Sequence, residues 1–137
     1  MINEAHKLLH DPEMRITDTA IRVPTLICHG VTCNIETQSK VTAEQARDAL
    51  RRAPGVKVVD DMERLEFPQP IQVAGGNLTH VGRIREDFSI ANGLNLFLVS
   101  DNVRKGAAQN AVQIAQVLVA EGYVEEWQKR RVRTSSV

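Results

Sequence analysis

The chain is organised around one stretch, Arg22-Val23-Pro24-Thr25-Leu26-Ile27-Cys28-His29-Gly30-Val31-Thr32-Cys33-Asn34-Ile35-Glu36-Thr37. The stretch begins with Arg22, which lies near the end of a segment with alternating faces. His29 lies near the middle of the stretch and is flanked by small residues. A guanidinium binds carboxylate or phosphate through two hydrogen bonds, and an imidazole titrates near neutral pH. The stretch therefore predicts an anion anchor beside a proton-transfer group.

Strand patterns lie on both sides of His29. Residues 16–23 alternate between two faces, and Arg22 lies on the face opposite Ile21 and Val23. Pro24 lacks a backbone donor, so this predicted strand ends there or lies at a sheet edge. His29 follows a turn, and residues 31–37 are rich in Val, Thr and Ile and predict a second strand.

Downstream residues predict one helix and three more strands. Thr42 and Gln45 have the spacing of a capping box, which begins a helix, and Pro54-Gly55 ends it. The predicted strands are 56–59, 78–85 and 94–99, separated by a charged loop over 60–70 and by turns at Gly75-Gly76-Asn77 and Asn92-Gly93. The last strand has few polar positions, so we expect it to be central and to pair antiparallel with 78–85.

Helical patterns occupy the two ends of the chain. Residues 1–9 have apolar side chains at helical spacing, and Asp11-Pro12 ends them. Residues 106–121 carry a wide apolar stripe, stopped by Gly122, that we expect to be exposed or covered by a partner. The basic tail, 123–137, is predicted to be a solvated, frayed extension, the alternative being a contact with an acidic partner.

Composition excludes several classes of function. The 137 residues suffice for one domain with its own core. Lys plus Arg and Asp plus Glu number 17 each, so no net charge attracts nucleic acid or an anionic membrane. The apolar runs are far shorter than the roughly 20 residues that span a bilayer, and no signal-peptide pattern is seen. We therefore expect a soluble, cytoplasmic protein with no nucleic-acid or membrane partner.

Cys28 and Cys33 flank His29, which leaves a metal site or a disulfide open. Zinc usually takes three or four ligands in paired spacings, and no second Cys or His pair follows at a recognisable distance. Buried or half-buried thiols are favoured, and no metal is expected.

A family resemblance rests on the quoted stretch and on three later blocks. The stretch supplies Arg-Val-Pro, then four residues, then His, and further on Asn-Ile-Glu-Thr. The later blocks are Val-Gly-Arg-Ile-Arg at 81–85, Asn-Gly-Leu-Asn-Leu at 92–96, and Ser-Asp-Asn-Val-Arg-Lys-Gly-Ala-Ala at 100–108, continuing to Ala115. Together these residues resemble the C-terminal domain of aspartate-semialdehyde dehydrogenase, from Met1 to about Glu121.

The resemblance implies an α+β fold, a mixed sheet with helices on one face, as in the C-terminal domain of the glyceraldehyde-3-phosphate dehydrogenase-like family. It assigns 1–122 to a dimerisation and catalytic domain truncated at its N-terminus, and 123–137 to a basic C-terminal tail. Met1 falls just after the family's substrate-contacting lysine, so we expect a truncation boundary there. In the family this domain forms a homodimer mainly through its sheet, and the helix matching 106–121 packs on the nucleotide-binding domain.

The resemblance also implies three site residues. His29 would be the catalytic acid and base, the alternative being a histidine hydrogen-bonded in a turn. Arg22 would bind the substrate carboxylate, the alternative being a surface ion pair with Asp18. Asn102 would contact the cofactor, the alternative being an N-cap or a turn side chain ahead of the last helix. The two roles are compatible, because a helix N-terminus favours anions.

Two departures from the family flank His29. Cys28 stands where the family has Gly, and Gly30 stands where it usually has Ser. If the backbone there has a positive φ, the added Cβ costs about 1 kcal/mol or more and could displace the histidine. A divergent, less active paralogue is therefore an open alternative.

The implied reaction is the NADPH-dependent reduction of aspartyl phosphate to aspartate semialdehyde and phosphate, or its reverse, in the biosynthesis of lysine through diaminopimelate, of threonine and of methionine. Cys28 and Cys33 lie outside the family's nucleophile motif, and no glycine-rich nucleotide loop is present. We therefore expect NADP to be held mostly by another domain and this chain alone to be inactive. The alternatives are a non-catalytic dimerisation or interaction module and, more weakly, a metal-binding protein.

Overall fold

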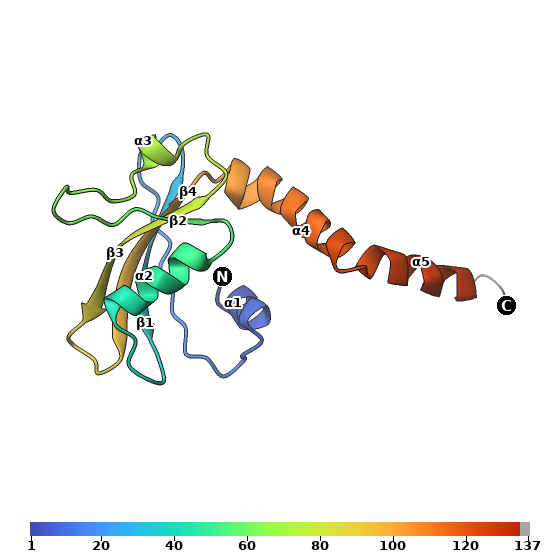
Figure 1. Cartoon of the computed structure of the whole chain (residues 1–137), viewed down its shortest axis with the longest axis horizontal. Helices are drawn as coiled ribbons and strands as arrows, with labels where there is room; N and C mark the ends of the chain where they lie inside the picture. The colour runs from blue at the N-terminus through green and yellow to red at the C-terminus, as the bar shows by residue number, and fades with distance from the viewer. Residues whose placement is uncertain (135–137) are drawn as a thin grey trace.

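The computed structural model describes the backbone of residues 1–134 and the side chains of residues 1–129. Its elements are α1 (Ile2–Leu9), β1 (His29–Glu36), α2 (Ala43–Arg52), β2 (Val56–Val58), α3 (Pro70–Val73), β3 (Thr79–Asp87), β4 (Gly93–Ser100), the π-helical turn η1 (Arg104–Ala108), α4 (Gln109–Ala120) and α5 (Tyr123–Thr134). The sheet forms the body of the molecule, and α4 and α5 project from it as an arm (Figure 1).

The sheet is mixed and has the strand order β1-β4-β3-β2. Strand β4 pairs antiparallel with β1 and with β3, whereas β2 and β3 are parallel. Helix α2 lies across β2 and β3, and its Ala46 packs in a core of Val81, Ile84, Leu94 and Leu96 (Figure 1). The predicted α+β fold with a mixed sheet is confirmed, as are the central place of β4 and its pairing with β3.

The short helix α3, which the sequence patterns did not predict, packs on the other face of the sheet. Because alternate residues of a strand face opposite sides, Val99 of β4 points away from the α2 side. It forms a second small core with Val73 of α3 and with Cys28. Thr32 and Asn34, which share this face on β1, stay exposed. The second face is therefore covered at one end and open at the other.

Polar side chains fix the ends and irregularities of these elements. The predicted capping box forms, since Thr42 Oγ1 accepts from the Gln45 N–H at 3.2 Å and Gln45 Oε1 accepts from the Thr42 N–H at 2.9 Å. A bulge in β3 gives Arg83 a φ of 56°. The buried Asp60 carboxylate holds this bulge by accepting from the Arg83 N–H at 2.7 Å, and it also accepts from Arg47 Nε at 2.8 Å.

The strand predicted over residues 16–23 is wrong. These residues pair with no strand in the described part of the chain, and the side chains of Ile21 and Val23 are exposed. The Thr25 N–H donates to the Val23 carbonyl, which turns the chain at Pro24. An alternating pattern is typical of a strand, but a strand also needs a neighbouring strand to pair with. None of the described strands pairs with this segment.

The sequence predicts a solvated, frayed extension for the tail. Residues 123–129 are exposed as expected, but residues 123–134 form helix α5, so the predicted fraying is wrong there. Gly122, with a φ of 75°, ends α4 as predicted, and Glu125 and Glu126 then lie in the first turn of α5, where negative charge favours a helix. Residues 135–137 lie outside the described residues, as do the side chains of the tail's arginines. The basic contact suggested for those side chains therefore stays a prediction.

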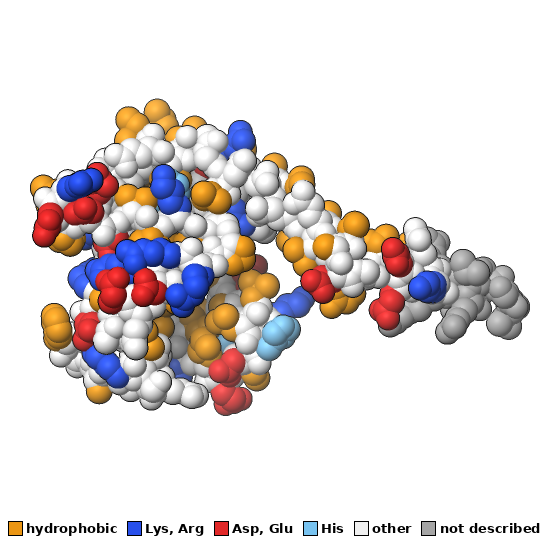
Figure 2. Space-filling model, in the orientation of Figure 1, with side chains coloured by type: hydrophobic (Ala, Val, Ile, Leu, Met, Phe, Trp, Pro, Cys, Tyr) orange, Lys and Arg blue, Asp and Glu red, His pale blue; other side chains and the backbone are white. Residues whose placement is uncertain are grey.

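The arm carries the exposed apolar face that the sequence predicted. The helix of 106–121 forms as η1 followed by α4, with its apolar side chains in solvent. The large apolar residues exposed on the described part of the arm are Val112, Ile114, Val117, Leu118, Val119, Tyr123, Val124 and Trp127. Figure 2 shows apolar atoms along the part of the arm next to the body of the molecule, which α4 forms. No helix in the described part of the chain is long and apolar enough to cross a membrane.

Candidate functional site

His29 is the first residue of β1 and lies opposite Ser100, the last residue of β4. Its side chain is exposed and forms no hydrogen bond or ion pair with any of the described residues. Cys28, immediately before it, is buried with a φ of 73°. The direction in which the imidazole leaves the sheet is therefore set by the backbone of this bend.

Asn102 holds the bend from a distant part of the chain. Its Oδ1 accepts from the Cys28 N–H at 3.0 Å, and the Cys28 thiol donates to the Pro70 carbonyl at 3.4 Å. The left-handed conformation at Cys28 is unfavourable for a residue with a Cβ. Two hydrogen bonds and the packing against Val73 and Val99 oppose that penalty.

Asp101 fixes the position of Asn102. Its buried carboxylate accepts from the Gly75 N–H at 2.8 Å, from the Val103 N–H at 2.9 Å and from the Arg104 N–H at 3.0 Å. These bonds, with the one from Gly75 contributing most, lower the pKa of Asp101. Asp101, and not Asn102, thus accepts the N–H groups of Val103 and Arg104 at the start of η1, while the Asn102 side chain binds Cys28.

Neither cysteine has the surroundings of a nucleophile. Burial raises the pKa of Cys28, with a further contribution from the negative charge of Asp101. Burial also raises the pKa of Cys33, which packs against the core beneath α2. Both thiols are free, and no cluster of three or more potential metal ligands occurs among the residues the structure describes.

Arg22 is the one predicted site residue that the structure does not tie to the other two. Its side chain is exposed, and in the described part of the chain no hydrogen bond or ion pair reaches it, including the pair suggested with Asp18. The bond from Asn102 to Cys28 brings Asn102 next to the His29 bend. The role of Arg22 stays a prediction.

Gly30, the second departure from the family pattern, faces Phe97. A Cβ built on Gly30 would lie 3.0 Å from Phe97 Cζ and 3.1 Å from Phe97 Cε2. A serine would therefore push the ring by a few tenths of an ångström. Because Gly30 has no side chain, the phenyl ring of Phe97 can lie directly against its backbone.

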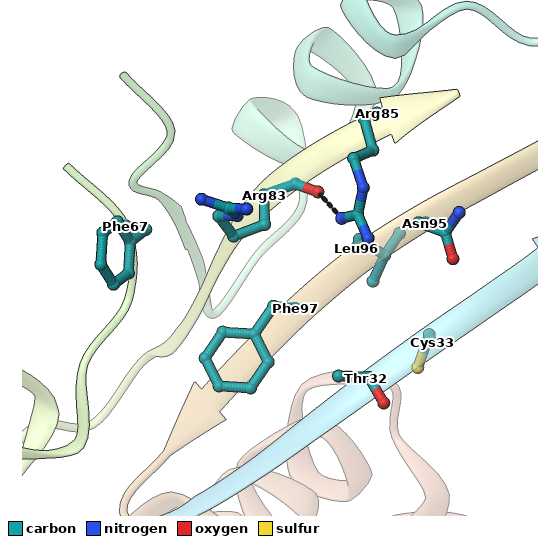
Figure 3. Close-up of a pocket in the computed structure, with 8 residues that line it drawn as sticks. All are labelled: Thr32, Cys33, Phe67, Arg83, Arg85, Asn95, Leu96 and Phe97. Carbon is teal, nitrogen blue, oxygen red and sulfur yellow. Dashed lines mark hydrogen bonds between the residues drawn. The ribbon is translucent and has the colours of Figure 1, made fainter. Parts of the chain in front are cut away.

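A separate pocket of about 320 Å³ lies along β1, β4 and β3 and contains none of the predicted site residues. It is lined by Thr32, Cys33, Phe67, Arg83, Arg85, Asn95, Leu96 and Phe97 (Figure 3). The Arg83 guanidinium lies 5.8 Å from the centre of the Phe67 ring, and Arg85 donates to the Arg83 carbonyl at 2.8 Å. Both cations are thus partly engaged by the pocket's own walls.

Sequence patterns missed Asp101 and Asp60, the two carboxylates that organise the backbone around the site and the bulge. Asp101 had a weak local signal, because an acidic residue shortly before a predicted helix often accepts the N–H groups at the helix start. Asp60 had none, since its partners Arg47 and Arg83 are distant in sequence.

Comparison with known proteins supports the resemblance. Residues 1–105 match the family model described as semialdehyde dehydrogenase, dimerisation domain. The aspartate-semialdehyde dehydrogenases of Aquifex aeolicus and Synechocystis are 42% and 44% identical to the chain over 124 residues, which is 90% of this chain and 36% and 37% of those proteins. The chain thus spans little more than a third of the length of these relatives.

A solved structure supports the same relationship. Aspartate semialdehyde dehydrogenase II of Vibrio cholerae, complexed with ASA, superimposes with a TM-score of 0.82 at 39% identity, over 88% of this chain and 35% of that one. The mixed sheet, the matched blocks and the family model agree over most of the chain. The chain belongs to the semialdehyde dehydrogenase dimerisation-domain family.

Proposed function

We propose that this chain is the C-terminal, substrate-side portion of an NADP-dependent aspartate-semialdehyde dehydrogenase, which converts aspartyl phosphate and NADPH to aspartate semialdehyde, phosphate and NADP⁺, or the reverse. The observation that carries the proposal is the exposed His29 imidazole on a backbone bend held by Asn102. A relative solved in complex with ASA has the same fold over this region.

His29 takes and returns the proton in the proposed reaction. An exposed imidazole with no competing hydrogen bond within the described residues is free to meet a reacting group from outside the chain. Arg22, likewise exposed and without a bonded partner in that part of the chain, would bind the substrate carboxylate through its planar guanidinium.

Asn102 can hold only part of a cofactor. Its Oδ1 is occupied by the Cys28 N–H, whereas its Nδ2 donates no hydrogen bond within the described residues and can reach an acceptor on NADP. When bound, NADPH supplies the hydride. One amide is too little for a dinucleotide, so most of the cofactor contacts would come from the part of the enzyme that this chain does not match.

We expect this chain to be inactive alone, because it also lacks a suitable nucleophile. A cysteine nucleophile reacts as its thiolate, and burial raises the pKa of both Cys28 and Cys33. The nucleophile would therefore come from the same part of the enzyme as the nucleotide site. The exposed apolar arm offers a surface on which that part can pack.

We propose a homodimer in the cytoplasm as the working form. The matched family model is a dimerisation domain, and the open end of the second sheet face offers a surface for self-association. Two free cysteines suit a reducing compartment.

The test is a phosphate-dependent assay, followed by NADPH absorbance, on this chain alone and mixed with a separately expressed N-terminal part of the Aquifex aeolicus relative. We expect activity only in the mixture, and a fall of about 10²- to 10⁴-fold for His29→Asn in that mixture. His10→Asn is the matched control, because His10 is exposed with a φ of 54° and asparagine tolerates a left-handed conformation.

A mixture that forms a complex but has no activity would refute the catalytic proposal. The chain would then be a non-catalytic dimerisation module, and sedimentation of the chain alone would show whether it self-associates.

A further inference from the structure

We propose that Asn102 is a positioning residue for His29: by accepting the Cys28 N–H it holds the left-handed bend that sets where β1 begins and how the imidazole leaves the sheet. The catalytic consequence rests on the proposed function. The structural role does not, since it depends only on contacts within this chain.

The first step is the cost of the bend itself. Cys28 has a Cβ and a φ of 73°, a conformation that residues other than glycine adopt rarely. Its side chain is buried, with 6% of the residue exposed, so water is a poor substitute partner for the Cys28 N–H. Removing the Asn102 acceptor would leave a strained residue with an unpaired buried donor.

The second step is the rigidity of the acceptor. Ser100, Asp101 and Asn102 follow one another, and Ser100 pairs with His29 in the sheet. Asp101 is buried and binds three backbone N–H groups around Asn102. Asn102 therefore presents its Oδ1 from a fixed point, at the same end of the sheet as the residue it controls.

The third step is the dependence of His29 on its backbone. Across the described residues nothing bonds to the imidazole, so no side chain can compensate for a shift of the bend. A change in φ at Cys28 re-aims the next residue directly. The position of His29 is therefore controlled by a hydrogen bond that joins residues 74 apart in sequence.

The test compares Asn102→Ala with Asn102→Asp, which keeps an acceptor oxygen at the same position, in the full 137-residue chain. Asn110→Ala is the matched control, because the Asn110 side chain accepts from Lys105 in the same helical segment and not from the bend. The first readouts are amide hydrogen exchange at Cys28 and nuclear Overhauser contacts of the His29 ring, both by NMR.

For Asn102→Ala we expect exchange at Cys28 to accelerate about tenfold or more and the His29 ring contacts to change, while strand β4 keeps its amide pattern. Asn102→Asp and Asn110→Ala should keep both readouts at the parent values. Unchanged Cys28 exchange and His29 contacts in Asn102→Ala would overturn the proposal, whatever the activity.

In the complemented assay, Asn102→Ala should lower kcat with little change in the substrate KM. Asn102→Asp keeps the acceptor for the Cys28 N–H but loses the Nδ2 donor, so it should retain more of kcat than Asn102→Ala while raising the KM for NADPH. In Asn102→Ala, a rise in the KM for NADPH alone, with His29 unmoved, would mean that Asn102 serves only as a cofactor contact and would overturn the positioning role. If no mixture is active, the proposed function fails, and the NMR comparison still decides the positioning role.

If Asn102→Ala unfolds, a second pair keeps the proposal testable. Glycine adopts a φ of 73° without the Cβ penalty, so the bend in Cys28→Gly needs less support. Two changes in the His29 contacts are compared. One is caused by Asn102→Ala in a chain that already carries Cys28→Gly, and the other by Asn102→Ser in the parent chain. We expect the first change to be smaller than the second. An equal or larger effect would contradict the proposed coupling.

Discussion

Arg22 and His29 belong to one short stretch, but the structure treats them differently. The His29 bend is held by side chains and carbonyls from distant residues, namely Asn102, Asp101 and Pro70. The segment around Arg22 is exposed. None of the described strands pairs with its backbone, and no described side chain forms an ion pair with the Arg22 guanidinium. The contrast shows that local sequence can name a candidate site residue, whereas distant partners decide whether the chain positions it without help.

The largest expected effect comes from breaking the support of the bend at Asp101. Asp101→Ala removes a buried carboxylate and leaves the N–H groups of Gly75, Val103 and Arg104 without their acceptor. The urea midpoint of unfolding should fall further than for any other variant proposed below. The control is Asp48→Ala, because Asp48 is exposed and pairs only with Arg51. Equal midpoints for the two variants would contradict the supporting role of Asp101.

The pH dependence of stability sharpens the same point. The pKa of Asp101 is lowered from its ordinary 3.8, chiefly by the bond from the Gly75 N–H, so the folded state binds this proton less readily than the unfolded state. Its stabilising contribution is complete above about pH 5 and is lost as the pH falls through the lowered folded pKa. Urea unfolding across this range should show a shallower acid loss in Asp101→Asn than in the parent chain, and parallel profiles would contradict this.

The strain at Cys28 gives a smaller effect with a defined sign. Because Cys28 has a φ of 73°, Cys28→Gly should be more stable than Cys28→Ala by about 1 kcal/mol. At Val23, in the unsupported segment, the same glycine and alanine pair should differ by less than about 0.5 kcal/mol. Urea unfolding of the four variants measures both differences in the free energy of unfolding. If Cys28→Ala were more stable than Cys28→Gly, the bend would not keep its positive φ in solution.

Sequence alone predicted what depends on nearby residues. The capping box at Thr42 and Gln45, the glycine stop at Gly122 and the apolar arm are set by local spacing, and all three are confirmed. The resemblance predicted a conformational strain at Cys28 if the backbone there has a positive φ, because the family has glycine at that position. The observed positive φ of Cys28 confirms that condition. What sequence missed, the unpaired segment over 16–23 and the carboxylate of Asp60, depends on partners that local patterns do not name.

The smallest effect on stability is expected at Arg22. Its exposed side chain has no bonded partner in the described part of the chain, so Arg22→Lys should change the free energy of unfolding by less than about 0.5 kcal/mol. In the complemented enzyme the same change should raise the KM for aspartate semialdehyde at least about tenfold, because lysine cannot form the two parallel bonds of a guanidinium with a carboxylate. Arg15→Lys is the matched control, since Arg15 lies in the same segment, is exposed and reaches only Glu36, at 3.8 Å. Unchanged kinetics for Arg22→Lys would remove Arg22 from the site and leave the supported bend at His29 as the whole contribution of this stretch to the chemistry.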